Sequence, residues 1–298
     1  MGAFPSPTAF HNRWGDDPLP LNPNPLSASP IGVFDSGAGG LTVLKALKKK
    51  LPHEDFIYLG DTARLPYGTK SERTVSQYSL RAANLLLKYN IKFLVIACNT
   101  ATSFGLSVLQ RTLSHLPICG VIEPCAGTAV KASKTEHIAV LATEGTIRSD
   151  IYRKSILRLN PDAYVQSLPA QLLVSVAEEG WIEGSETESI VTRYLQNLSA
   201  KNDVLVLGCT HFPVFTPILK RLCLDDLSII DSGSSTADFV ADMLLETNLM
   251  NSQTEKGRLS FLVTDLPERF AKMSPIFLGE NIDLADIDLV DMPMIVDF

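Results

Sequence analysis

Two cysteines follow short apolar runs in closely similar settings. The first, Cys98, ends such a run in "VIACNTATSF" (95–104), and an amide and a threonine come directly after it. The second, Cys209, ends a run in "VLGCTHFPVF" (206–215), where a threonine and a histidine follow. A free cysteine usually packs in a core as a small apolar residue. Two cysteines with matched surroundings favour a chemical role for both thiols.

The surroundings indicate what chemistry the two thiols could support. A cysteine placed after a strand and before a helix lies at a helix N-terminus, where free amides and the helix dipole favour the thiolate. The same amides can bind a carboxylate. Asn99, Thr100 and Thr210 add polar groups beside Cys98 and Cys209. We therefore expect each segment to combine a thiol of lowered pKa with part of an anion site.

His211 is the candidate partner of the second thiol, because a histidine two residues away can orient or deprotonate it. A zinc site is the alternative. A single Cys-x-His pair with one distant cysteine lacks the paired spacing of zinc sites, so we expect no metal. The other three cysteines, Cys119, Cys125 and Cys223, are interpreted as packing residues.

Polar residues also follow the first apolar run of the chain. The segment "FDSGAGGLTV" (34–43) places Asp35 and Ser36 there, before a glycine-rich loop. A phosphate loop is the competing interpretation. The segment has no Lys-Ser/Thr pair, and a threonine takes the last position of the Gly-x-Gly-x-x-Gly pattern. We therefore interpret the loop as a site of close backbone approach to another ligand.

Two further segments follow other predicted strands. In "DTARLPYGTKS" (61–71), Pro66, Tyr67 and Gly68 form a predicted turn that could close over a ligand. In "ATEGTIRS" (142–149), Thr143 takes the place in the second half of the chain that Ser36 takes in the first. Each of these residues alone is typical of a turn or a helix cap. Their common position after strands favours a shared site.

The elements that would position these residues alternate between strands and helices. Apolar runs predict strands at 31–35, 56–60, 93–97, 118–122, 138–142, 163–168, 203–207, 228–231 and 258–265. Helical patterns occur at 41–50, 71–90, 125–133, 146–159, 185–200, 234–247 and 267–279. Such alternation predicts an α/β fold with doubly wound, mostly parallel sheets, whose carboxyl ends bind ligands. We expect an edge strand within 282–292.

The first eight strands fall into two series of four at a near-constant offset, with each candidate cysteine after the third strand of its series. This spacing predicts an internal duplication. Two similar α/β halves that face each other would bring the two thiols to one cleft.

Composition excludes several functional classes. The chain has 298 residues, 45% hydrophobic and 20% charged, and a net charge of −7, with no basic block that would indicate nucleic-acid binding. It lacks an apolar stretch of about 18 residues and a signal peptide, so we expect a cytoplasmic protein with no membrane contact. Five cysteines in such a chain indicate free thiols. Residues 1–30 carry seven of the 18 prolines and predict a flexible tail.

As a set and in this order, DSGAGG, DTARLPYG, CNTAT, GCTHFP and the DSG at 231–233 resemble the glutamate racemases of the aspartate/glutamate racemase superfamily. The resemblance runs from about Ile31 to about Gly279. It implies a two-base reaction without cofactor, in which one thiolate removes the α-proton of L- or D-glutamate and the other thiol protonates the opposite face. It also implies two domains, 31–122 with 234–298 and 123–233.

The resemblance assigns roles to the candidate residues. Cys98 and Cys209 are the implied bases, assisted by Asp35 and His211 respectively. The implied substrate-binding residues are Asp35, Ser36, Pro66, Tyr67, Gly68, Asn99, Thr100, Thr143, Thr210 and His211. Glu178, in "LLVSVAEEG" (172–180), takes the place of a further catalytic acid. That segment departs from the family pattern, because Ala170-Gln171 replaces a Cys-Pro-like pair and Ser175 replaces a proline.

The family supplies D-glutamate for peptidoglycan, and some members with N-terminal extensions resemble enzymes activated by a cell-wall precursor nucleotide. The tail at 1–30 therefore makes activation by UDP-N-acetylmuramoyl-L-alanine a hypothesis for this chain, and a homodimer is another. Two alternatives stay open. The first is a racemase for aspartate or a related acid. The second is a two-lobed carboxylate-binding module without chemistry, which would need no matched thiols.

Overall fold

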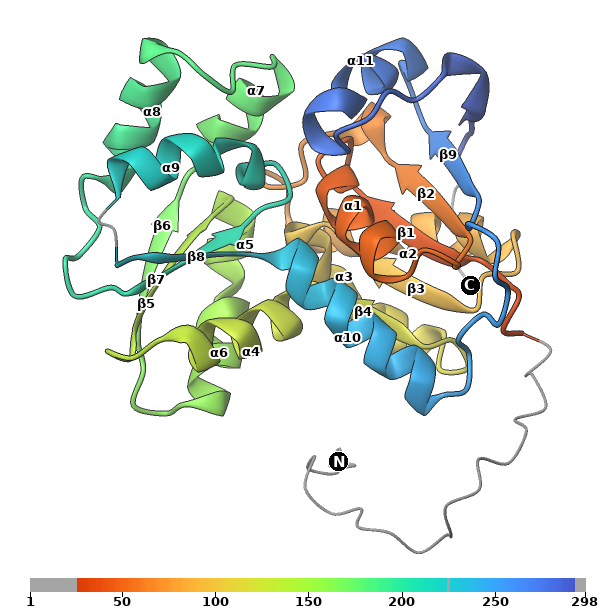
Figure 1. The fold of residues 1–298 in the computed structure, drawn as a ribbon, viewed down its shortest axis with the longest axis horizontal. Helices are drawn as coiled ribbons and strands as arrows, with labels where there is room; N and C mark the ends of the chain where they lie inside the picture. The colour runs from red at the N-terminus through yellow and green to blue at the C-terminus, as the bar shows by residue number, and fades with distance from the viewer. Residues whose placement is uncertain (1–25, 224–225, 293–298) are drawn as a thin grey trace, which may run out of the picture.

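The computed structural model describes residues 26–223 and 226–292, which form two parallel sheets with helices packed around them (Figure 1). The predicted tail at 1–30 lies almost wholly outside the described residues. The first sheet has six strands in the order β10-β9-β2-β1-β3-β4, and every neighbouring pair is parallel. Its strands are β1 (Ile31–Asp35), β2 (Phe56–Gly60), β3 (Phe93–Ile96), β4 (Ile118–Gly120), β9 (Leu259–Val263) and β10 (Ile287–Leu289).

The second sheet has four parallel strands in the order β6-β5-β7-β8. They are β5 (His137–Ala142), β6 (Tyr164–Pro169), β7 (Val204–Gly208) and β8 (Ser228–Asp231). This order repeats the order β2-β1-β3-β4 of the first sheet, strand for strand. The predicted α/β fold of two pseudo-symmetric, doubly wound halves is therefore confirmed.

Helices cover both sheets and complete two lobes. In the first lobe they are α1 (Leu41–Lys50), α2 (Glu72–Leu87), α3 (Asn99–Thr112) and α11 (Pro267–Phe277). In the second they are α4 (Ile122–Ala132), α5 (Glu144–Ser149), α6 (Ile151–Leu159), α7 (Leu172–Glu178), α8 (Ser185–Leu195) and α9 (Thr216–Leu222). Helix α10 (Ser232–Glu246) packs against both α1 and α4 and so joins the lobes. Three short 3-10 helices are η1 (Thr62–Arg64), η2 (Phe212–Phe215) and η3 (Leu284–Asp286).

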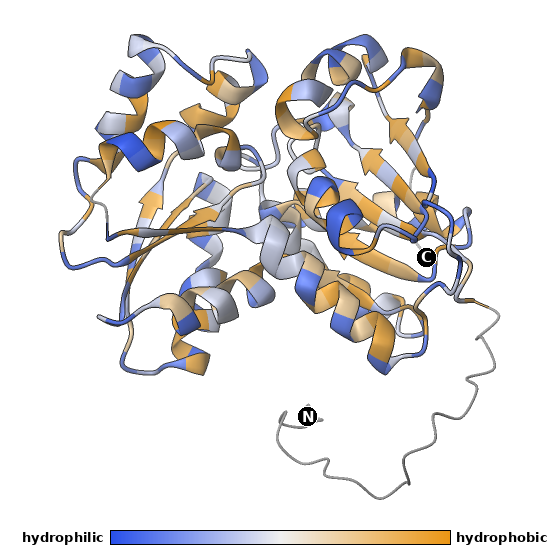
Figure 2. Cartoon of the chain, viewed as in Figure 1, coloured by the Kyte–Doolittle hydropathy of each residue, from blue (hydrophilic) through white to orange (hydrophobic). Residues whose placement is uncertain are grey.

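The central strands are apolar throughout because both faces of each sheet are covered. Along β1, Ile31 and Val33 point into one buried cluster and Phe34 into another, as the two-residue period of a strand requires. The first cluster continues into the second lobe, whereas the other lies between the first sheet and helices α2 and α3. Figure 2 shows the resulting apolar strands inside and mixed helices outside.

The structure differs from the sequence prediction at several elements. The helix expected at 146–159 is two helices, α5 and α6, because Asp150 between them has a left-handed backbone with φ of 59°. The predicted helices include neither α7 nor α9. The expected edge strand is confirmed, since β10 pairs only with β9. Domain boundaries at 122/123 and 233/234 stay a prediction.

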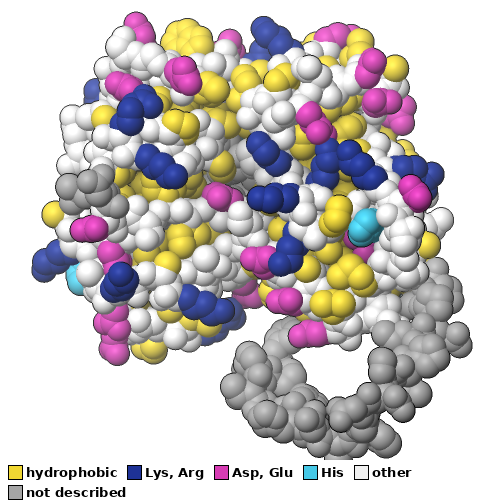
Figure 3. All heavy atoms as spheres, viewed as in Figure 1, with side chains coloured by type: hydrophobic (Ala, Val, Ile, Leu, Met, Phe, Trp, Pro, Cys, Tyr) yellow, Lys and Arg dark blue, Asp and Glu magenta, His cyan; other side chains and the backbone are white. Residues whose placement is uncertain are grey.

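The structure can be compared with the expectations that the protein binds neither nucleic acid nor a membrane. Basic and acidic side chains are mixed over the face drawn in Figure 3. Within 26–223 and 226–292, no helix combines the length and the apolar character that a bilayer crossing requires.

Candidate active site

The carboxyl ends of β1, β3, β5 and β7 meet at a small cavity between the two lobes. Its volume is about 20 Å³, which accommodates roughly one water molecule. The lining residues are Ser36, Leu65, Pro66, Tyr67, Gly68, Cys98, Asn99, Thr100, Thr143, Val174, Cys209, Thr210 and His211. The structure thus brings together both candidate cysteines and every substrate-binding candidate except Asp35.

Cys98 lies at the end of β3 and is the N-cap residue of α3. Its sulfur accepts a hydrogen bond from the N–H of Ala101 at 3.4 Å, and its thiol donates to Ser36 Oγ at 3.6 Å. Burial raises the pKa of the thiol to about 12, and the nearby carboxyl of Asp35 adds to the rise although both hydrogen bonds oppose it. The expectation of a lowered pKa is therefore wrong for Cys98, because desolvation outweighs the helix terminus.

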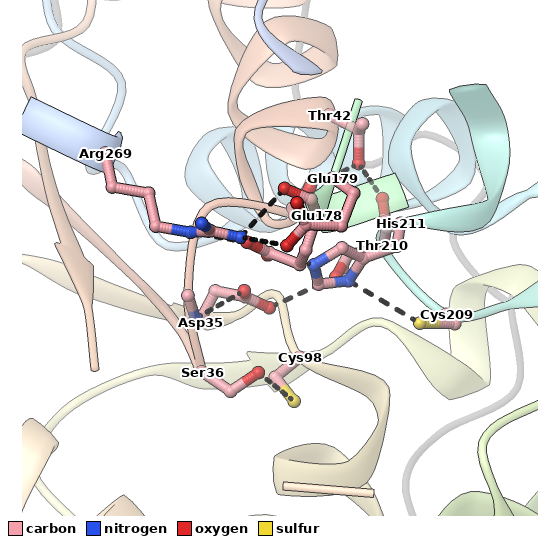
Figure 4. A network of polar contacts seen from close by, with 12 residues as sticks. Asp35, Ser36, Thr42, Cys98, Glu178, Glu179, Cys209, Thr210, His211 and Arg269 are labelled. Carbon is pink, nitrogen blue, oxygen red and sulfur yellow. Dashed lines mark hydrogen bonds and ion pairs between the residues drawn. The ribbon is translucent and has the colours of Figure 1, made fainter. Parts of the chain in front are cut away.

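Cys209 follows β7 in the equivalent position, but no α-helix begins directly after it. The chain continues through Thr210 and His211 into the 3-10 helix η2, and α9 starts only at Thr216. The expected helix N-terminus is thus replaced by a short turn. Instead, Cys209 Sγ lies 3.8 Å from His211 Nδ1 (Figure 4).

His211 is held between the thiol and a carboxylate. Its Nε2 lies 2.7 Å from Glu178 Oε1 at the end of α7, and the Phe277 ring packs nearly perpendicular to the imidazole. Burial alone acts to lower the pKa of His211, but hydrogen bonds and charge interactions with Cys209 and Glu178 raise it well above its ordinary value. The imidazole thus links the sulfur of Cys209 to the carboxylate of Glu178.

The glycine loop of the first lobe packs directly on this imidazole. A Cβ atom at Gly39 would lie 2.5 Å from ring atoms of His211, so no side chain fits there. The loop is also tied to the second lobe by Thr42, whose hydroxyl donates to the Thr210 carbonyl at 2.9 Å. This explains the glycine-rich segment without a phosphate ligand.

Asp35 lies behind the cavity and is fully buried. Its carboxylate accepts hydrogen bonds from Gly37 N–H at 2.9 Å and from the Thr210 hydroxyl at 3.3 Å. Burial raises its pKa, although His211 and the hydrogen bonds oppose the rise. No hydrogen bond joins Asp35 to Cys98 in the described part of the chain, and the influence of Asp35 on that thiol is one of charge.

Asn99 supplies a free donor to the cavity. Its Oδ1 accepts a hydrogen bond from the Tyr152 hydroxyl of the second lobe at 2.7 Å. Its Nδ2 is buried and has no hydrogen-bond partner among the described residues. Because a buried amide needs a partner, this NH₂ group is suited to bind a polar ligand atom.

Threonine hydroxyls connect the lobes on the far side of the cavity. Thr100 Oγ1 lies 2.9 Å from Thr143 Oγ1 and 3.2 Å from Thr146 Oγ1. The Gly145 N–H donates to the Gly68 carbonyl at 2.8 Å, which also crosses from one lobe to the other. These contacts close the cavity, so entry of a ligand larger than water requires them to separate.

The predicted turn at 66–68 is anchored in the first lobe. The Tyr67 hydroxyl donates to Asp61 Oδ2 at 2.6 Å, and its ring is buried against Phe34. Gly68 is the residue whose carbonyl reaches the second lobe.

Sequence reasoning missed four residues of the site. Leu65 and Val174 line the cavity, and Tyr152 bonds to Asn99, which lines it as well. Arg269 lies one residue further out, where it contacts Glu178, the partner of His211. Leu65 lies inside the DTARLPYG segment, and an apolar residue in that segment could have been proposed as part of the cavity wall. The other three approach from separate elements, and no local pattern indicates them. No group of three or more metal-ligating side chains is arranged to hold a metal ion within the described ranges.

The arrangement places one thiol from each lobe on a single cavity with free and charged polar groups between them. A site of this kind belongs to the two-lobed α/β enzymes that carry an acid–base group on each side of the substrate. Sequence and structural comparisons agree. A family model described as Asp/Glu/Hydantoin racemase matches residues 31–240, and the chain belongs to this family.

Individual relatives extend the match over most of the chain. A glutamate racemase of Geobacter metallireducens is 45% identical over 250 residues, which cover 84% of this chain and 92% of that protein. Francisella tularensis glutamate racemase in complex with D-glutamate has a TM-score of 0.83 at 34% identity, covering 89% of this chain and 98% of that one. Escherichia coli glutamate racemase in complex with L-glutamate and the activator UDP-MurNAc-ala has a TM-score of 0.71 at 25% identity, covering 84% and 95%.

Proposed function

We propose that this protein is a glutamate racemase, an isomerase that interconverts L- and D-glutamate with two cysteine bases. The observation that carries the proposal is the single cavity lined by Cys98 from the first lobe and Cys209 from the second. The relatives support the choice of substrate, since glutamate racemases that are 39% and 45% identical match most of this chain.

The reaction moves one proton off the α-carbon and another onto it. A thiolate on one face takes the α-proton, and the electron pair of the C–H bond stays on the substrate as a carbanion. The thiol on the other face then gives its S–H proton to that carbon. Thiolate and thiol have exchanged places, so the reverse reaction uses the same two groups in opposite roles. Cys98 and Cys209 fill these roles, with Asp35, Glu178 and His211 acting on them.

The carbanion is stabilised by groups aimed at the substrate carboxylate. The free Nδ2 of Asn99 and the hydroxyls of Ser36, Thr100 and Thr143 are the candidate donors, whereas the Thr210 hydroxyl already donates to Asp35. Because these groups are buried and already oriented, they cost little reorganisation during the reaction. Pro66, Tyr67 and Gly68 form the wall that closes over the substrate.

Substrate entry needs the lobes to separate, because glutamate is several times larger than the water-sized cavity. The contacts between the lobes that hold it closed include the Gly68–Gly145 hydrogen bond, the threonine cluster and the Tyr152–Asn99 bond. Closure around the substrate then excludes water and strengthens the polar interactions with it.

The substrate is tested with purified protein and the enantiomers of glutamate and aspartate, followed by circular dichroism. We expect both glutamate enantiomers to racemise and aspartate to turn over more slowly. Faster turnover of aspartate would favour a racemase for that acid. Tight binding of glutamate with no loss of optical activity would indicate a binding module.

We also propose that the D-glutamate made by this enzyme serves peptidoglycan biosynthesis and that the protein acts in the cytoplasm. Growth of a D-glutamate auxotroph carrying this chain tests the role. A strain that still requires D-glutamate, despite producing active protein, would contradict it.

Two further parts of the proposal concern partners. Activation by UDP-N-acetylmuramoyl-L-alanine is supported by the N-terminal segment and by the Escherichia coli enzyme, which was captured with such an activator. The racemisation rate measured with and without this nucleotide tests the activation. Equal rates would contradict it. Assembly into a homodimer is tested by the mass in solution.

A further inference from the structure

A cation from the first lobe reaches the carboxylate that supports His211. Arg269 lies on α11, and its guanidinium donates to the Glu178 carbonyl oxygen at 3.0 Å and to Glu179 Oε1 at 3.1 Å. Its Nε is 3.9 Å from Glu178 Oε2. Figure 4 shows the arginine extending toward both glutamates, which belong to the end of α7 in the second lobe. The contact therefore bridges the lobes.

The two oxygens of Glu178 face different partners. Oε2 is turned toward Arg269, whereas Oε1 lies 2.7 Å from His211 Nε2. The other ring nitrogen of His211 is the atom next to the sulfur of Cys209. Arg269, Glu178, His211 and Cys209 thus form a continuous series of polar contacts. Within this series, only Arg269 comes from the first lobe.

The charges in this series of contacts favour an ionised Glu178. Burial acts to raise the pKa of Glu178, but His211 and the charge of Arg269 outweigh it and the pKa is lowered. An ionised Glu178 fixes the proton on His211 Nε2 and keeps the imidazole turned toward the sulfur. Arg269 also contacts the last carbonyl of α7, a favourable place for a cation.

Among the described residues, Cys98 has no corresponding series of charged contacts. The groups around Cys98 are the Ser36 hydroxyl, the Ala101 N–H and the carboxyl of Asp35, none of which is a cation. Any effect of Arg269 on proton transfer should therefore appear at one thiol and not at the other.

We propose that Arg269 is a positioning residue for the Cys209 side of the reaction, where it holds Glu178 and through it His211 when the lobes are closed. This inference rests on the proposed racemase function. An exposed ion pair contributes little to folding by itself. Since the arginine side chain is 47% exposed, its contact with Glu178 is better explained by that role than by stability.

The effect of Arg269 on each thiol can be measured separately with a reaction that needs only one of the two thiols. 3-Chloroglutamate loses its α-proton to a thiolate and chloride from the adjacent carbon, and this loss of HCl needs one base only. In a Cys98→Ser background the base is Cys209, and in a Cys209→Ser background it is Cys98. Arg269→Gln is placed in each background, and elimination is followed by chloride release.

We expect Arg269→Gln to slow elimination about tenfold in the Cys98→Ser background, a part of the ~10²–10⁴-fold that a positioned acid–base group supplies. In the Cys209→Ser background the rate should change less than about twofold. Arg269→Lys, which keeps the charge, should recover part of the loss. Arg158→Gln, which breaks an exposed pair with Glu123 in the second lobe, is the matched control and should change neither rate.

Three results would overturn the inference: an equal loss in both backgrounds, no loss in the Cys98→Ser background, or no recovery with lysine. An equal loss would mean that Arg269 acts on lobe closure as a whole. Failure of the proposed function looks different, because the unmodified protein would then racemise no glutamate at all. Thermal unfolding of each variant shows that the compared proteins are folded.

Discussion

The surroundings of Cys98 and Cys209 differ although the fold places both at equivalent strand ends. Cys98 caps a long helix, bonds to a neutral hydroxyl and has a raised pKa. Cys209 precedes a short turn and lies beside a histidine that is bound to Glu178. The duplicated sheets therefore explain where the thiols are. The side chains that contact each thiol differ between the two halves.

Serine in place of either cysteine should have the largest effect, because one face of the substrate then loses its acid–base group. We expect Cys98→Ser and Cys209→Ser each to reduce racemisation about 10²–10⁴-fold or more. Circular dichroism of glutamate solutions measures the rate. Cys223→Ser, at a half-buried cysteine remote from the cavity, is the control. Wild-type rates in both single variants would disprove the two-base scheme.

Removing the imidazole of His211 should impair proton transfer at Cys209 more than at Cys98. His211→Asn is expected to lower kcat about 10²-fold, since the cation beside Cys209 and its link to Glu178 are both lost. Elimination from 3-chloroglutamate should fall much more in the Cys98→Ser background than in the Cys209→Ser background. His115→Asn, at an exposed histidine, should leave both rates unchanged. Equal losses in the two backgrounds would show that His211 serves the pocket as a whole.

Tyr152 should affect binding more than proton transfer. Its hydroxyl orients the Asn99 amide, so Tyr152→Phe should raise KM for glutamate several-fold, as expected for about 1 kcal/mol from one hydrogen bond. We expect kcat to change less than KM. Steady-state kinetics in both directions provide the measurement, with Tyr164→Phe at an exposed tyrosine as the control. An unchanged KM would mean that the Asn99 amide is oriented by something else.

The Glu178–His211 pair should also appear in the pH dependence of stability. The pKa of Glu178 is lowered, so its contribution is present above the usual carboxyl range and is lost as the pH falls through the folded value. The pKa of His211 is raised, so its contribution is complete below about pH 6.5 and is lost as the pH rises through the folded value. The pair should therefore stabilise the protein most near pH 6.

Glu178→Gln should lower the free energy of unfolding by about 1–2 kcal/mol at pH 6. The difference from the unmodified protein should shrink as the pH falls through the folded pKa of Glu178. Urea unfolding at several pH values measures it, and Glu183→Gln at an exposed glutamate is the control. A difference that does not change with pH would contradict the linkage.

Much of the fold could be predicted from the sequence because its signals are local. Buried parallel strands are apolar throughout, and turns and caps follow them directly, which located Ser36, Asn99 and Thr143. The break at Asp150 could not be predicted, because it depends on one residue with a left-handed backbone inside a continuous helical pattern. Helix α7 was missed since its seven residues are too few to show a period.

The chemistry of the site was harder to predict. A helix N-terminus after Cys98 is visible in the sequence, but the burial that raises its pKa depends on the second lobe. Arg269 and Tyr152 reach the site across the gap between lobes, from helices far away in the chain. Such contacts leave no local pattern.

The most direct test of the central claim is the fate of the α-hydrogen during racemisation in deuterium oxide. If two different thiols serve the two faces, D-glutamate formed early from L-glutamate carries deuterium, while the remaining L-glutamate keeps its hydrogen. The mirror result should hold when the reaction starts from D-glutamate. A product that retains the original hydrogen, measured by mass spectrometry of the separated enantiomers, would show that a single base serves both faces and would contradict the account.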